Sequence, residues 1–263
     1  MDNQQQNFNN QIIQDYLSGI SGNRLSQKYN KNISSIMYLL RKNNIPIRSI
    51  GDNVIKAKYN KPNIIFSQEF KEILTGLLMG DGSLRIHKKG RNPLYTHTDK
   101  NLEAIQYFKQ LFENQGIKVS NIWINSKSKC YYFQTESLKE FIEFYDLFYP
   151  IDSKKRLPNI NITPIILKFW YIGDGSIKKQ NGTLNNSCNI SNKWGNSFIL
   201  NQFKSLFSNN SNYYKDEQKN CGSFYIPHKG LIKMLEYIGE CPVECYKYKW
   251  IIRRCSETIM EES

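Results

Sequence analysis

This sequence has few histidines, no long hydrophobic runs and no Cys-X-X-Cys pair. Only 3 of its 263 residues are histidine, and none of its 6 cysteines belongs to a Cys-X-X-Cys pair, which excludes the common zinc patterns. All the apolar runs are short, such as Leu77–Met79, and this excludes a transmembrane helix. The opening residues, MDNQQQNFNN, have neither a basic nor an apolar signal region. We therefore expect no secretory or transit peptide, reduced thiols and an intracellular protein.

Acidic residues are scarce relative to basic ones. The chain has 36 Lys and Arg against 23 Asp and Glu, a formal net charge of +13. The excess is even, at +5 over residues 1–60, +4 over 61–162 and +4 over 163–263, which excludes a single basic tail. This charge favours a polyanionic partner such as nucleic acid, although a basic protein without such a partner is an open alternative. A hydrophobic content of 40% excludes full disorder, and the length suits one large domain or two smaller ones.

Residues 1–48 have the spacing of short helices. Apolar residues between Ile12 and Leu17 recur at helical intervals, Ser18-Gly19 breaks the pattern, and Asn32 or Ser34 can cap a later helix. The segment resembles the resolvase-type helix-turn-helix family, which implies a DNA-binding segment whose last helix enters the major groove. A plain three-helix packing unit is the alternative, and residues 49–66 are predicted to be a linker. The candidate DNA contacts on the last helix are Ser35, Arg41 and Lys42.

The remaining chain is organised as two similar halves, residues 67–162 and 163–263. Each half begins with an apolar helix that ends in Gly-Asp-Gly-Ser, continues with a basic hairpin and a second helix, and closes with strands and a final helix. This order predicts an internal α/β duplication.

The repeated Gly-Asp-Gly motif is the sharpest feature. Asp81 and Asp174 each fall at the C-terminal end of an apolar helix, where the helix dipole disfavours a carboxylate by about 0.3–1 kcal/mol. If the two helices pack side by side about a pseudo-twofold axis, the two acids meet and can hold a divalent cation such as Mg²⁺, helped by the carbonyls of Gly80 and Gly173. Two unrelated Asp-Gly turns are the alternative.

These motifs resemble the LAGLIDADG homing endonuclease family in its single-chain, two-motif form, over about residues 66–255. The resemblance implies an α+β fold, a pseudo-twofold duplicated αββαββα arrangement, here with the small all-α helix-turn-helix segment in front. It also implies a monomer that cuts both strands of DNA at a long asymmetric site with Mg²⁺, or with Mn²⁺ as a substitute. The first copy matches at Leu74, Gly76, Leu77, Asp81 and Gly82; the second has Phe169 and Trp170 in place of smaller residues and, with Thr163-Pro164, is similar to the second motif of one branch.

The resemblance also implies basic and polar catalytic residues. Lys155 lies in a basic-apolar-Pro segment before the second motif, and Lys247 lies in a Tyr-Lys pair near the C-terminus, with Lys249 as a neighbouring competitor. His97 takes the position of a polar, water-orienting residue, whose counterpart in the second repeat is Ser191 or Asn192. The lysines stabilise charge on the phosphate in this interpretation, whereas ordinary surface cations are the alternative.

The two predicted hairpins, Ser83–Thr98 and Ser176–Ser191, fit DNA recognition because a two-stranded ribbon fits the major groove. Their lysines are expected to contact phosphates, and some are expected to be solvated turn charges. The candidate DNA contacts are Arg85, His87, Lys88, Lys89 and Arg91 in or near the first hairpin, and Lys178, Lys179, Asn185 and Lys193 in or near the second.

The leading hypothesis is thus a site-specific homing endonuclease that promotes the mobility of an intron or a free-standing gene. An RNA-binding maturase that binds its own intron RNA, or a non-catalytic DNA-binding protein on the same scaffold, is the alternative, and a recombinase is a weaker third. No membrane partner is expected. The location is expected to be the mitochondrion or another organelle matrix if the gene is organellar, and otherwise the cytoplasm or nucleus of a phage or viral host.

Overall fold

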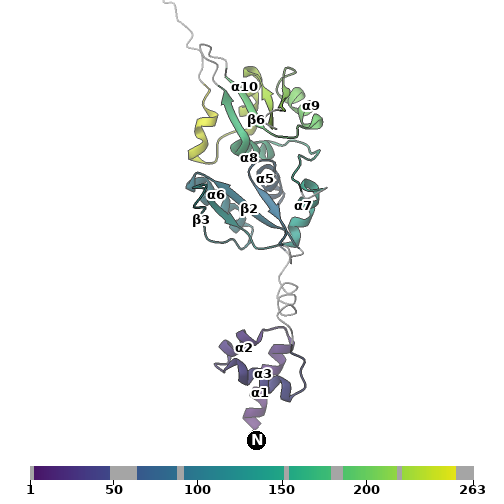
Figure 1. The fold of residues 1–263 in the computed structure, drawn as a ribbon, viewed down its shortest axis with the longest axis vertical. Helices are drawn as coiled ribbons and strands as arrows, with labels where there is room; N and C mark the ends of the chain where they lie inside the picture. Colours follow the sequence, from purple (N-terminus) through teal and green to yellow (C-terminus); the bar gives the residue numbers. More distant parts are fainter. Residues whose placement is uncertain are drawn as a thin grey trace, which may run out of the picture. The chain divides into compact units, whose positions relative to one another are not determined.

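The computed structural model describes residues 3–47, 64–87, 92–150, 154–178, 186–217 and 221–252. The chain divides into two compact units, Met1–Asn63 and Ile64–Ser263 (Figure 1). Of the predicted linker at 49–66, residues 64–66 belong to the second unit, where the Phe66 ring packs edge-on against Phe70. Among the described residues, none of the helices combines the length and apolar character that a bilayer span requires.

The described residues of the first unit, 3–47, form a three-helix cluster made of α1 (Asn3–Leu17), α2 (Gly22–Lys28) and α3 (Ile33–Lys42). Helices α2 and α3 begin where side chains satisfy free backbone N–H groups: Ser21 Oγ accepts from Arg24 N, and Asn32 Oδ1 accepts from Ser34 N. The apolar side of each helix faces a small shared core, and the polar side faces solvent. The fully buried core side chains are Ile12, Tyr16, Leu25, Ile36 and Leu40.

In its described residues the second unit contains twice the order helix, two strands, helix, two strands, helix, and a short 3-10 helix precedes the last α-helix in the first series and follows it in the second. The first series is α5 (Gln68–Met79), β1 (Ser83–Arg85), β2 (Leu94–Asp99), α6 (Leu102–Asn114), β3 (Trp123–Ile124), β4 (Tyr131–Gln134), η1 (Lys139–Phe141) and α7 (Ile142–Phe148). The second is α8 (Pro164–Asp174), β5 (Gly175–Lys178), β6 (Ser187–Ser191), α9 (Ser197–Leu206), β7 (Asn212–Asp216), β8 (Cys221–Ile226), α10 (His228–Ile238) and η2 (Glu244–Trp250). The predicted α+β class and duplicated αββαββα order are confirmed.

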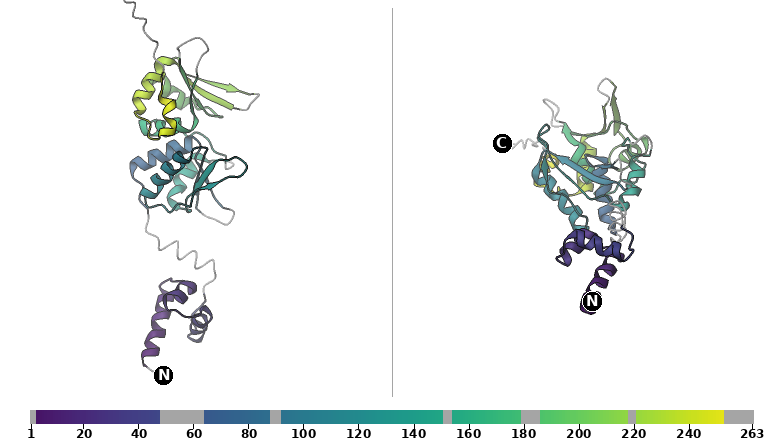
Figure 2. Two further views of the ribbon diagram at one scale, coloured as in Figure 1. Left: turned by 90° about the vertical axis from the view of Figure 1, so that its left-hand side faces the viewer. Right: turned by 60° about the horizontal axis from the view of Figure 1, so that its bottom comes forward.

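The two antiparallel sheets have equivalent topology. Their strand orders are β1-β2-β4-β3 and β5-β6-β8-β7. Ser83 pairs with Thr96 in the first sheet, and Ser176 pairs with Asn189 in the second, so equivalent positions in these strands lie 93 residues apart, as the two motif acids do. In the left view of Figure 2, the helices of both repeats gather on one side and the strands project on the other, which leaves one face of each sheet open.

Helices α5 and α8 pack against each other at the centre of the unit (Figure 1). They approach closely because Gly76 has no side chain: a Cβ there would lie 2.5 Å from the Ile166 carbonyl oxygen. A single hydrophobic core extends through both repeats, with Trp170 and Tyr171 from α8 among its largest members. This packing fixes the relative placement of the two helix ends.

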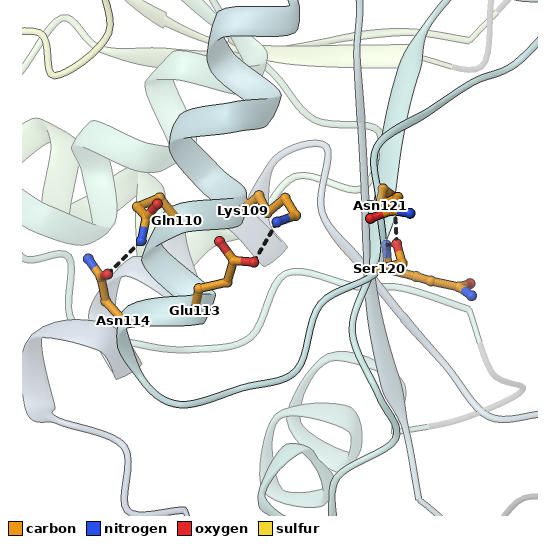
Figure 3. A network of polar contacts seen from close by, with 7 residues as sticks. Lys109, Gln110, Glu113, Asn114, Ser120 and Asn121 are labelled. Atoms are coloured by element: carbon orange, nitrogen blue, oxygen red, sulfur yellow. Dashed lines mark hydrogen bonds and ion pairs between the residues drawn. The ribbon is translucent and has the colours of Figure 1, made fainter.

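The outer side of α6 carries polar pairs one helical turn apart (Figure 3). Lys109 Nζ forms an ion pair with Glu113, and Gln110 Nε2 donates to Asn114 Oδ1 at 2.8 Å. Such pairs contribute roughly 0.2–0.5 kcal/mol each to a helix. They stabilise α6 itself and leave the other side of the helix for the sheet.

Candidate functional site

The ends of the two motif helices place Asp81 and Asp174 together. A Cβ built on Gly173 would lie 3.2 Å from Asp81 Oδ2 and 3.5 Å from the Gly80 Cα, so the two helix ends touch. Helix α8 extends to Asp174, whereas α5 ends at Met79, and its C-cap residue Gly80 precedes Asp81. The two carboxylates therefore meet at the junction of the repeats, although they lie 93 residues apart in sequence.

The negative charges of the Asp81 and Asp174 carboxylates at this junction are only partly compensated by nearby cations. Burial, and then the charge of Asp81, raise the pKa of Asp174 to about 7. Desolvation, and then the charge of Asp99, also raise the pKa of Asp81, although this side chain reaches solvent. The ammonium groups of Lys155 and Lys249 act in the opposite direction. A site that disfavours two ionised acids is one that a bound cation would stabilise.

Lys155 is half-buried beside the first motif, at the position predicted to be catalytic. Its Nζ donates to the carbonyl oxygen of Gly82 at 2.8 Å and to that of Gly80. Burial lowers the pKa of Lys155 to about 8, while Asp174 and Asp81 partly oppose this shift. The side chain is thus a cation held against the helix end, within electrostatic reach of both acids.

Lys249 takes the equivalent place beside the second motif, and the prediction of Lys247 is corrected. Lys249 is 6% exposed, and its Nζ donates to the carbonyl oxygens of Ile172 and Gly173. Lys247 is exposed and forms an ion pair with Glu244 at 2.5 Å, so it points away from the acids. The sequence contains Tyr-Lys twice in succession, at 246–247 and 248–249, and the choice between these two registers depends on how η2 packs.

His97 is buried in the core, which contradicts its prediction as a water-orienting residue. It is 3% exposed, its Nδ1 is 2.7 Å from Tyr95 Oη, and its ring packs on Phe108. Burial lowers its pKa to about 3, so the ring is neutral. The equivalent position in β6 is the core residue Ile190. Successive strand residues point to opposite faces, and His97 is on the helix-covered face.

A polar residue of the same strand that lies within electrostatic reach of Asp81 is Asp99, which sequence reasoning missed. Its charge raises the pKa of Asp81 and acts on Lys249. By strand register its counterpart is Asn192, one of the two alternatives left open for the second repeat. Both side chains accept a bond from the N–H two residues ahead, Asn101 in one repeat and Trp194 in the other. This shared turn is a local signal, but only the register shows that it adjoins the acids.

The oxygen atoms at the junction suit a hard divalent cation. Among the described residues, no three His, Cys, Asp or Glu side chains form a metal cluster, so a cation here would depend on the two acids, backbone carbonyls and a ligand of its own. The carbonyls of Gly80 and Gly173, predicted as metal ligands, accept from Lys155 and Lys249. Each carbonyl has two lone pairs, and the lysine uses one.

A basic groove runs from Asp174 over the open face of the second sheet. Its volume is about 690 Å³. The predicted Lys178 and Lys193 line it, as do Arg156, Asn189 and Lys215, of which Lys215 lies on the edge strand β7 outside the predicted hairpin. Cations dominate this surface, which therefore favours an anionic partner.

The other predicted DNA contacts are not among the described residues that line this groove. Arg85 and His87 are exposed at the first sheet, where Arg85 Nη2 donates to Gln134 Oε1 at 2.7 Å. Ser35, Arg41 and Lys42 are exposed on α3 in the first unit. Lys88, Lys89, Arg91, Lys179 and Asn185 fall outside the described residues.

Comparison with known protein families assigns this architecture. Residues 71–232 match the LAGLIDADG DNA endonuclease family, and the chain belongs to that family, as its two motifs predicted. The fold is also similar to that of the homing endonuclease I-WcaI bound to its DNA recognition sequence, with a TM-score of 0.62 and 19% identity over 81% of this chain and 98% of that one.

Two curated proteins are similar in sequence over part of their length. Protein RecA of Mycobacterium shimoidei is 33% identical over 132 residues, which are 48% of this chain and 29% of that protein. An uncharacterized protein, MJ1098 of Methanocaldococcus jannaschii, is 32% identical over 130 residues, which are 46% of this chain and 48% of that protein. The match spans less than half the length of each of these relatives.

Proposed function

We propose that this protein is a site-specific homing endonuclease that makes a metal-dependent double-strand break in DNA at a long, asymmetric target. The observation that carries this proposal is the pair of acids, Asp81 and Asp174, at touching helix ends, each beside a lysine on the terminal carbonyls. Membership in a DNA endonuclease family supports the reaction class. The break would promote the mobility of an intron or a free-standing gene.

Asp81 and Asp174 would hold the Mg²⁺, or Mn²⁺ in its place. Their raised pKa values fit a site whose stable form includes a cation, and the second lone pairs of the Gly80 and Gly173 carbonyls supply further oxygen ligands. When bound, the ion would stabilise negative charge on the attacking and leaving oxygens and favour ionisation of water.

Lys155 and Lys249 would stabilise the charge that develops on the phosphate. Both are fixed cations in a partly desolvated site, where electrostatic interactions are stronger than in water. The pKa of about 8 lets Lys155 hold its proton at neutral pH and release it in mildly alkaline solution. The two lysines supply one cation to each half of the site.

Double-stranded DNA would lie along the open faces of the two sheets. Lys178, Lys193 and Lys215 in the groove suit phosphate contacts, and Asn189 can accept from and donate to an adenine edge. In the first unit, α3 presents Arg41 and Lys42 to solvent, and we propose it as a second DNA-binding segment. Two separate DNA contacts fit a long target.

The test is cleavage of a plasmid that carries the DNA sequences from the two sides of this gene, joined directly to each other as in a copy of the locus that lacks the gene. With Mg²⁺ the protein should convert this plasmid to a single linear product, and Asp81→Asn or Asp174→Asn should abolish conversion. The matched control is Asp146→Asn, the same change at an exposed acid on α7. Specific binding without cleavage in either Mg²⁺ or Mn²⁺ would overturn the proposal in favour of a non-catalytic DNA-binding protein, and binding to intron RNA alone would favour a maturase.

A further inference from the structure

The segment that carries Lys249 belongs to the second repeat but is bonded to the first. The backbone N–H of Glu244 donates to Glu103 Oε1, on the first turn of α6, at 3.0 Å. Two residues further along, Tyr246 Oη donates to Asp99 Oδ2. Helix η2 therefore crosses between the repeats, and its position depends on two acids of the first repeat.

Tyr246 connects Asp99 to Lys249 directly. The Lys249 Nζ lies 4.9 Å from the centre of the Tyr246 ring, a cation–π distance. Tyr246 is only 7% exposed, so its ring is held by packing and its hydroxyl needs the bond that Asp99 provides. The backbone of Lys249 is fixed as well, because its carbonyl accepts from Tyr171 Oη at 2.8 Å.

Both carboxylate oxygens of Asp99 are engaged by protein groups. Oδ1 accepts from the Asn101 N–H at 2.8 Å, and Oδ2 accepts from Tyr246. Because both oxygens already accept hydrogen bonds, the role of this carboxylate is to fix the position of Tyr246. We propose that Asp99 and Tyr246 form an inter-repeat latch that positions the Lys249 ammonium for cleavage of one of the two DNA strands. This inference rests on the proposed nuclease function and names two positioning residues for it.

The latch is confined to one half of the site. Asn192, the counterpart of Asp99, accepts from the N–H groups of Trp194 and Gly195, and in the described part of the chain no tyrosine hydroxyl is bonded to its side chain. The segment that follows Lys155 is held instead by Asn196, whose Nδ2 donates to the Leu157 carbonyl at 3.1 Å. Breaking the latch should therefore weaken one half of the site more than the other.

The first experiment follows both strands of the plasmid target under single-turnover conditions. Tyr246→Phe keeps the ring and removes only the hydroxyl, and the matched control is Tyr248→Phe, at an exposed ring in the same segment. We expect Tyr246→Phe to slow cleavage of one strand about tenfold, because the loss of a hydrogen bond to a charged group usually has an effect of this size. Nicked circles should accumulate while target affinity stays at the wild-type value, and the loss of this bond should lower Tm by at most a few degrees. Asp99→Ala should have the same effect as Tyr246→Phe, and the double variant should cleave no more slowly than either single variant.

The second experiment does not depend on cleavage. Lysine acetylation by acetic anhydride, read by mass spectrometry on the full chain, should be slow at Lys249 and severalfold faster there in Tyr246→Phe, while the exposed Lys247 serves as the internal reference. Equal slowing of cleavage at both strands, or an unchanged acetylation rate at Lys249, would overturn the latch. The latch would also be overturned if Asp99→Asn were inactive while Tyr246→Phe remained fully active, because Asp99 would then act on the reacting groups itself. A wild-type protein that never cuts would contradict the nuclease proposal, and acetylation would still decide the latch.

Discussion

Lys155 and Lys249 occupy equivalent places in the two repeats. The first donates to the carbonyls of Gly80 and Gly82, and the second to those of Ile172 and Gly173, so each caps the C-terminal end of a motif helix. Helix C-termini carry partial negative charge and attract cations. Each lysine thus offsets the unfavourable position of the adjacent acid, because its charge opposes the rise in the pKa of Asp81 and Asp174.

The corrected assignment of the second lysine can be tested directly. Lys249→Ala should lower the cleavage rate by about 10²–10³, the usual cost of removing one charge-stabilising donor. Lys247→Ala should cleave at close to the wild-type rate, because its ammonium is bonded to Glu244 on the surface. The measurement is single-turnover cleavage of the plasmid target, with Tm for both variants. An inactive Lys247→Ala with an active Lys249→Ala would restore the assignment made from sequence.

The stability of the metal-free protein should decrease as pH rises from about 4 to about 7. The pKa of Asp174 is raised to about 7 from 3.8, so the native state binds this proton more tightly than the unfolded state does, and unfolding becomes easier as the proton is lost. We expect Tm to fall by a few degrees over this range, and the fall to be smaller in Asp174→Asn. Added Mg²⁺ should raise Tm more at about pH 8 than at about pH 5.5. Equal effects of Mg²⁺ at both values would argue against carboxylate ligation.

Gly76 should be required for close packing of α5 and α8. In Gly76→Ala the new Cβ would meet the Ile166 carbonyl oxygen at 2.5 Å and the Phe169 Cβ at 2.8 Å. Since these atoms are backbone and core, we expect a loss of about 1–3 kcal/mol in the free energy of unfolding. Gly80→Ala is the packing control, because its nearest neighbour would lie at 3.6 Å. Urea denaturation of both variants measures the difference, and equal stabilities would contradict the close contact.

The role of α3 in DNA binding predicts an effect on affinity without an effect on chemistry. Arg41→Ala with Lys42→Ala should weaken target binding and, if both side chains contact phosphates, reduce the salt slope of binding by about 2. The cleavage rate at saturating protein should not change. Lys233→Ala, an exposed lysine on α10, is the control. Unchanged affinity and slope in the double variant would support a plain packing unit instead.

The fold and the two acids could be predicted from sequence because their signals are local and repeated. Apolar runs ending in Gly-Asp-Gly at residues 80–82 and 173–175 define both motif helices, and the hairpins that follow them fix the order of elements. His97 was misassigned because it lies inside β2 and faces the core, whereas Asp99, two residues further on the same side of the strand, lies at the end of β2 within electrostatic reach of Asp81. Lys215 was missed because it becomes part of the groove only when β7 pairs with β8.

The sequence by itself determined the class of the fold, the duplication and the identity of Asp81 and Asp174, since residue type and spacing are written along the chain. Only the tertiary structure decided which lysine joins Lys155 and which polar residue approaches Asp81. Those choices depend on the packing of η2 across the repeats and on strand register. The contact between Tyr246 and Asp99 joins residues 147 positions apart, a distance over which the sequence carries no periodic signal.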